Sequence, residues 1–155
     1  MKILSLLLVL ILAGCSLGPD PTDQDYAKAI AKIPDAGAAK YMASASYHPN
    51  VIMGNLFSFN SVGIPGRLFV LSDKLLFAAY DEPSNTFLPT YEIGYSEIDW
   101  ITWQQHGVNS IMRYGSDNTA NSFLFTQSMD PAAQDIENSV IQQYIIDRHI
   151  IGKSK

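Results

Sequence analysis

Apolar and polar positions along the chain divide it into three regions. An apolar stretch whose only polar member is Ser5 occupies residues 3–13. From Val51 onward, short apolar runs of β type alternate with turn residues. After Asp130 the apolar residues recur at helical spacing. The pattern therefore predicts a mainly β domain that follows an apolar leader and ends in a helix.

Six or seven short strands are predicted in the central region. They cover residues 55–59, 67–71, 74–80, 87–93, 97–104, 108–114 and 122–126. Turn residues separate them at 63–66, at 72–73, in the polar loop 81–85, at Gly107 and in the polar loop 115–121. Strands of this length and spacing are typical of an antiparallel barrel or sandwich.

Helices are predicted on both sides of these strands. The first begins near Thr22, which forms a capping-box pattern with Asp25, and ends at Pro34. Residues 40–47 fit either a weak helix or a strand. The last helix follows Asp130 and ends at Gly152. Its apolar face comprises Ile136, Val140, Ile141, Tyr144 and Ile145. Together the elements predict an α+β fold in which a helix covers one end or face of a small barrel.

A Pro-Gly pair at 65–66 leads into an apolar run that ends at Ser72, and Leu75-Leu76-Phe77 follows it. Together with residues 95–101, this stretch resembles the signature of GRAM domains, which belong to the pleckstrin-homology (PH) superfold. The resemblance covers roughly residues 50–127. It implies a PH-like barrel of six or seven antiparallel strands with a C-terminal capping helix. Members that bind phosphoinositides carry a Lys and Arg cluster around the first hairpin. Only Arg67 and Lys74 stand there, so phosphoinositide binding is not expected.

The apolar leader ends in Leu12-Ala13-Gly14-Cys15. A charged start, a short apolar run and small residues before the cut are typical of a secretory signal peptide. A cysteine directly after Ala-Gly is similar to the lipobox of bacterial lipoproteins. The resemblance implies that residues 1–14 are removed and that Cys15 carries fatty acyl chains such as palmitate. An ordinary signal peptide with a chance cysteine and an N-terminal membrane helix are the alternatives. Residues 3–13 fall well short of the roughly 20 that a membrane helix needs.

This resemblance implies an exported protein anchored to a membrane of the cell envelope. In Gram-negative lipoproteins an Asp after the cysteine favours the inner membrane. Ser16 stands there, which favours the periplasmic face of the outer membrane in such a host. We divide the chain into a signal peptide (1–14), a lipidated tether (15–25), an N-terminal helix with its connecting segment (26–50) and the PH-like barrel with its C-terminal helix (51–152). Fully extended, residues 16–25 would span about 35 Å.

The charge and the cysteine count of the chain limit which partners and which covalent modifications we expect. The chain has 15 acidic and 10 basic residues, a formal net charge of −5. Such a surface is a poor match to nucleic acid, which we exclude as a partner. Cys15 is the only cysteine, so an intrachain disulfide is impossible and lipidation accounts for the residue.

The sequence contains no evident catalytic motif. The histidines are His48, His106 and His149. They lack ligand spacing, so we expect neither a metal site nor a cofactor beyond the lipid on Cys15. Residues 94–98 begin like a Gly-x-Ser-x-Gly nucleophile elbow, but the second glycine is missing and a strand follows. Glu97 and Asp99 alternate as on the solvated face of a strand. We therefore assign no catalytic residue.

The candidate binding surface is the aromatic cluster Trp100, Trp103, Tyr91 and Tyr95. The two tryptophans lie three positions apart, so on a regular strand they face opposite sides. Two interpretations are open: packing in the core or at its rim, and an exposed patch that docks a partner or an apolar ligand. We expect a non-catalytic binding or accessory module at the membrane surface, with an envelope protein as partner. A carrier of lipid or another apolar ligand and a small envelope hydrolase are the alternatives.

Overall fold

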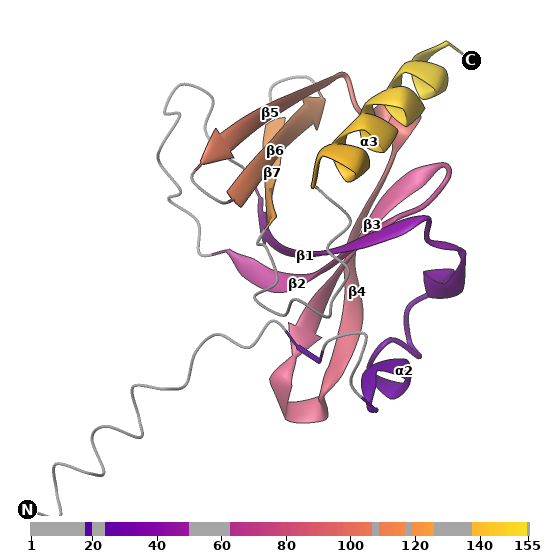
Figure 1. Cartoon of the computed structure of the whole chain (residues 1–155), viewed down its shortest axis with the longest axis vertical. Helices are drawn as coiled ribbons and strands as arrows, with labels where there is room; N and C mark the ends of the chain where they lie inside the picture. The colour runs from indigo at the N-terminus through magenta and orange to yellow at the C-terminus, as the bar shows by residue number, and fades with distance from the viewer. Residues whose placement is uncertain are drawn as a thin grey trace, which may run out of the picture.

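The computed structural model describes residues 18–19, 24–49, 63–106, 109–116, 119–125 and 138–154. Within them, seven antiparallel strands form one sheet in the order β4-β3-β2-β1-β7-β6-β5 (Figure 1). The strands are Tyr41–His48 (β1), Ile64–Val70 (β2), Lys74–Asp81 (β3), Thr86–Gly94 (β4), Trp100–His106 (β5), Asn109–Ser116 (β6) and Thr119–Phe125 (β7).

Strand β1 joins the two halves of the sheet. Its residues from Tyr41 to Tyr47 pair with β2, and those from Ala45 to His48 pair with β7. In Figure 1 strands β1–β4 and strands β5–β7 form two halves of the sheet, and side chains from both halves meet in one core. The sheet is not closed, because among the described residues β4 pairs only with β3 and β5 only with β6. The expected mainly β fold with a C-terminal helix is thus confirmed, as a barrel-like sandwich with two free edges in the described chain.

The helices are short except for the last one. They are α2 (Tyr26–Ala29), the 3-10 helices η1 (Ala36–Ala38), η2 (Glu82–Ser84) and η3 (Tyr95–Glu97), and α3 (Asn138–Lys153). Helix α3 packs against η3 at the connection between β4 and β5. Ile141 and Ile145, from its predicted apolar face, are buried. Its predicted start at Asp130 and the predicted strand 55–59 lie outside the described residues.

Helix α3 continues through Gly152 instead of ending there. A Cβ built on Gly152 would lie 3.1 Å from the backbone nitrogen of Ser96 and from the carbonyl carbon of Tyr95. The helix ends at Lys153, one residue after the predicted Gly152, and the glycine also permits close contact between the helix and η3. Nearer the N-terminus, the helix predicted from Thr22 to Pro34 covers only the four residues of α2 within the described residues 24–34. A helix this short depends on packing for its stability.

Three predicted boundaries in the sheet are wrong. Residues 64–66 belong to β2 instead of a turn, because Gly66 fits a close approach to β3. The strand predicted from Glu97 begins at Trp100, because the Glu97 carboxylate accepts a 2.7 Å hydrogen bond from the Gly94 N–H and stabilises η3. The polar residues 115–121 contain the end of β6 and the start of β7, which extend the hairpin beyond the apolar positions. Residues 40–47, open between helix and strand, form most of β1.

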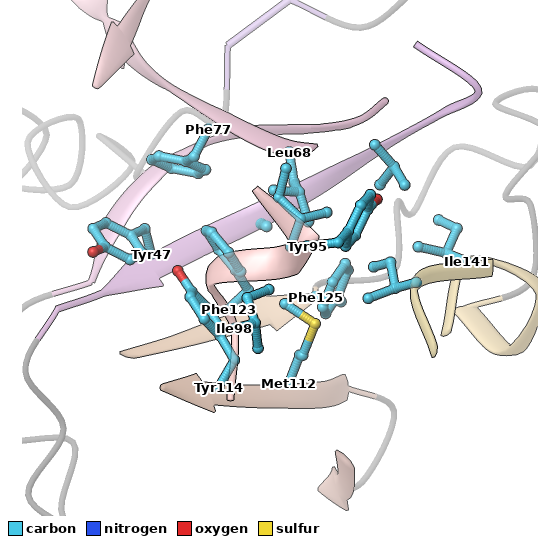
Figure 2. Packing of buried hydrophobic residues seen from close by; sticks show 14 residues of the cluster. Tyr47, Leu68, Phe77, Tyr95, Ile98, Met112, Tyr114, Phe123, Phe125 and Ile141 are labelled. Carbon is cyan, nitrogen blue, oxygen red and sulfur yellow. The ribbon is translucent and has the colours of Figure 1, made fainter. Parts of the chain in front are cut away.

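Two hydrophobic cores lie on opposite faces of β2 and β3. The inner core, between the two halves of the sheet, is drawn in Figure 2. Its buried residues are Ala45, Tyr47, Leu68, Val70, Leu75, Phe77, Tyr95, Ile98, Met112, Tyr114, Phe123, Phe125, Ile141 and Ile145. The outer core comprises Ala29, Ile33, Phe69, Leu71, Leu76, Ala78 and Phe87. Successive side chains of β2 and β3 point alternately into the inner and the outer core. Both faces of these strands are therefore buried, which explains why their sequences are almost continuously apolar.

Gly66 provides a test of this close packing. A Cβ at that position would lie 2.1 Å from the backbone oxygen of Ala78. We expect Gly66→Ala to lower the free energy of unfolding by about 1–3 kcal/mol or more, because the backbones of β2 and β3 must separate. Urea denaturation measures the change. Gly37→Ala is the matched control, since nothing lies within 4 Å of a Cβ there, and it should change stability by less than about 1 kcal/mol. Equal effects of the two substitutions would contradict the packing argument.

Candidate functional site

The two tryptophans of the predicted surface lie on opposite faces of β5. Ile101 and Trp103 pack against the inner core, and the Trp103 ring lies 5.4 Å from that of Phe125, centroid to centroid. Because side chains alternate along a strand, Trp100 and Thr102 lie on the outer face. Trp100 is half-buried there and Thr102 is exposed. The pair is therefore divided between the inner core and the outer face of β5.

The two tyrosines do not join Trp100 on the outer face. Tyr95 is only 2% exposed, and its hydroxyl donates a 3.2 Å hydrogen bond to the backbone oxygen of Leu71. Of the two open interpretations, packing in the core therefore applies to Tyr95, because the η3 turn directs this side chain inward. Tyr91 is half-buried on β4 and stacks on Tyr47, with 4.8 Å between ring centroids. The structure thus separates the predicted cluster into one outward residue and three that take part in packing.

Sequence reasoning did not identify the tyrosine cluster formed by Tyr47, Tyr91 and Tyr114. These residues come from β1, β4 and β6, and only the fold brings them together. The Tyr114 ring lies 6.3 Å from that of Tyr91, and the Tyr47 hydroxyl donates a 3.2 Å hydrogen bond to Oδ1 of Asn121. Burial raises the pKa of Tyr47 to about 12 and raises the pKa values of Tyr91 and Tyr114 as well. All three hydroxyls therefore remain protonated and uncharged at neutral pH.

The histidines come from separate elements. His48 is buried at the end of β1, where a Cβ on Gly63 would meet its ring at 2.6 Å. On α3, Nδ1 of His149 lies 3.3 Å from the backbone oxygen of Tyr95. The side chain of His106 lies outside the described part of the chain. Among the described residues, no three His, Cys, Asp or Glu side chains are grouped so that they could hold a metal ion.

The acidic residues have structural partners at the surface. Glu92 forms a 2.9 Å ion pair with Lys74, and Asp99 forms one of 2.7 Å with Lys153. Glu97 caps η3, and both Glu97 and Asp99 are exposed. Glu97 lies in this 3-10 turn and Asp99 follows it, so the two do not share one face of a strand as predicted. Ser96 lies in the same turn, which leads into β5. A nucleophile elbow requires a strand followed by a helix, so this serine has no such geometry.

A second arrangement missed by sequence reasoning surrounds Arg67. This residue of β2 is 4% exposed and makes a hydrogen bond with the Ser44 hydroxyl. Its Nη2 donates a 3.2 Å hydrogen bond to the backbone oxygen of Pro19. The sequence signal for it is a single arginine within an otherwise apolar strand, because a charge buried there requires hydrogen-bond partners.

Comparison with protein-family models and with curated proteins finds no match. In the described part of the chain, no helix combines the length and the apolar character needed to cross a membrane. The functional proposal therefore rests on the sequence of the chain and on the arrangement of its described side chains.

The buried tyrosines predict a loss of stability in alkaline solution. An unfolded tyrosine ionises near pH 10, whereas Tyr47 in the folded protein does so at about pH 12. A raised pKa in the folded state means that the stability is complete below about pH 10 and declines above it, by about 1.4 kcal/mol per pH unit for each such tyrosine. Urea denaturation across this range measures the decline. Tyr47→Phe should make it less steep, and an unchanged slope would show that Tyr47 ionises freely in the fold.

Proposed function

We propose that this protein is a lipid-anchored module of the bacterial envelope, which binds a protein partner at the membrane surface without catalysing a reaction. The observation that carries the binding role is Trp100. It lies on the outer face of β5, a strand that pairs on one side only within the described residues. An aromatic side chain on a strand at the edge of the described sheet suits a partner that adds a strand or packs on the ring.

The filled interior favours binding on the outside over carriage of a ligand within. Aromatic rings from both halves of the sheet meet there (Figure 2). Phe123 of β7 lies 5.6 Å from Phe77 of β3 and 5.4 Å from Tyr114 of β6, between ring centroids. An apolar ligand would have to displace these side chains from a closely packed core. A carrier role therefore ranks below surface binding.

The anchor in this proposal is the covalent lipid on Cys15. Its support is the Leu-Ala-Gly-Cys sequence after a short apolar leader. Two or three acyl chains hold a protein on a bilayer stably, whereas one does so marginally. Ser16 favours the outer membrane of a Gram-negative host as the location. Seven antiparallel strands followed by α3 support the proposed relationship to GRAM domains and the PH superfold, but fold alone does not identify the partner.

Replacing the anchor cysteine tests the location. We expect Cys15→Ala to move the protein from the membrane fraction to the soluble fraction, because no acyl chain is then attached. Fractionation and intact-mass measurement record the shift and the loss of acyl mass. Ser16→Ala is the matched control and should leave the protein anchored. Unchanged membrane retention of Cys15→Ala, with no acyl mass on the parent protein, would reject the lipoprotein assignment.

Replacing the outward tryptophan tests the binding role. In-cell crosslinking of the anchored protein, followed by affinity capture and mass spectrometry, should identify one dominant partner. We expect Trp100→Ala to lower its yield about tenfold or more, since a buried interface tryptophan commonly contributes 2 kcal/mol or more. Thr102→Ala, on the same face of β5, should have little effect. A partner captured equally by both variants would show that the binding surface lies elsewhere, and the absence of any partner would favour a small ligand or a hydrolase.

A further inference from the structure

Gly18 and Pro19 lie against the sheet although they belong to the predicted tether. A Cβ built on Gly18 would lie 2.5 Å from Cζ of Phe87 and 2.7 Å from Cδ2 of Tyr80. The φ of Gly18 is +86°, a left-handed conformation that favours glycine. Figure 1 shows this short indigo segment beside the β3–β4 hairpin. Both the contact and the backbone conformation thus suit glycine and no larger residue.

Arg67 holds the same segment from within the sheet. Its guanidinium lies 6.0 Å from the centroid of the Phe87 ring, and its Nη2 donates to the backbone oxygen of Pro19 at 3.2 Å. A buried guanidinium is stable only when its donors find acceptors. The backbone at position 19 is therefore one of the groups that accommodate this charge, which opposes release of the segment from the sheet.

Covalent geometry limits the distance between this contact and the anchor. Three Cα–Cα steps separate Cys15 from Gly18, and they span at most about 11 Å. Gly18 contacts Tyr80 and Phe87, which pair with each other, and one further pair, Asp81 with Thr86, separates them from the turn of the β3–β4 hairpin. A lipid on Cys15 must therefore enter the bilayer close to the turn end of this hairpin.

We infer that the docked residues 18–19 make the turn end of the β3–β4 hairpin the membrane-facing end of the domain, with the bilayer headgroup region as the surface that it meets. This inference rests on the proposed lipid anchor at Cys15. In Figure 1 the hairpin turn and strand β5 lie toward opposite ends of the molecule. The outward face that carries Trp100 is thereby held away from the leaflet.

The residues of the hairpin end fit a neutral lipid surface. Leu88 is 38% exposed, and the hydroxyl of the half-buried Tyr80 donates a 2.9 Å hydrogen bond to Oδ1 of Asn85. Apolar and tyrosine side chains are favourable at the headgroup boundary. Asp81 and Glu82 add negative charge at the same end, which opposes attraction to anionic lipids. The anchor therefore brings this end to the bilayer, and uncharged phosphatidylcholine vesicles are suitable for a test.

A depth measurement on the full-length lipidated protein tests the orientation. Cys15 is the only native cysteine and carries the lipid, so Glu82→Cys in η2 and Ser72→Cys in the β2–β3 turn each accept one fluorophore. The eight residues of β3 separate these exposed positions by about 25 Å. In phosphatidylcholine vesicles that contain a nitroxide headgroup lipid, we expect several-fold stronger quenching at position 82 than at position 72. Equal quenching, or stronger quenching at position 72, in the vesicle-bound protein overturns the inference.

Substitution at Gly18 tests whether docking causes the orientation. The Cβ of Gly18→Ala would clash with Phe87 and Tyr80, so the segment should leave the sheet and the difference in quenching should be lost. Gly37→Ala is the matched control because its Cβ meets nothing within 4 Å, and it should retain the difference. An unchanged difference in Gly18→Ala, with circular dichroism showing an intact sheet in both variants, would contradict the role of docking.

Failure of the anchor can be distinguished from failure of docking. Absence of acyl mass on Cys15 and of vesicle binding would reject the anchor, and the orientation with it. Docking has its own readout in the soluble Cys15→Ala protein, where nuclear Overhauser effects should connect the Hα protons of Gly18 to ring protons of Phe87. Their absence in a folded protein would overturn the docked segment whether or not Cys15 is acylated.

Discussion

Burial of β2 and β3 on both faces is the constraint on which the rest of the fold depends. Leu68 opposite Phe77 contributes to the inner core, and Phe69 opposite Leu76 contributes to the outer one. An apolar face on each side of one strand pair requires two separate covers. The other half of the sheet with α3 provides the first, and residues 26–39 provide the second. The short α2 therefore persists because it closes the outer core, and not because of its own helical propensity.

The sequence predicted those parts of the fold in which local pattern and tertiary packing agree. The strands at 74–80 and 87–93 and the reversal between β2 and β3 follow from apolar runs bounded by turn residues. Pro65 and Gly66 were misassigned because locally they signal a turn. In the structure Pro65 precedes the first residue of β2 that pairs with β3, where a missing N–H is tolerated, and Gly66 permits backbone contact. No local pattern reports a contact with a strand that lies elsewhere in the chain.

In the candidate surface, too, the features set by local pattern were predicted and those set by contacts with distant strands were not. Alternation along a strand was enough to place Trp100 and Trp103 on opposite faces. It could not place Tyr95, because that residue lies in the η3 turn and α3 packs over the connection. The cluster of Tyr47, Tyr91 and Tyr114 unites three strands and depends entirely on the crossing of the two halves. The placement of side chains along one strand could therefore be predicted from the sequence, whereas a cluster formed by side chains of several strands could not.

Docking of residues 18–19 would limit the orientations that the proposed lipid anchor at Cys15 allows the domain. A free tether of residues 16–25 would let the domain turn in any direction above the leaflet. With Gly18 against Phe87 and with Arg67 bonded to the backbone of Pro19, only three chain steps would remain between the proposed lipid on Cys15 and the sheet. An oriented domain has less rotational freedom left to lose when it binds a partner than a freely turning domain has. In the proposed arrangement, the docked segment would then also increase the effective affinity for a partner that binds at the opposite end, where the outward tryptophan lies.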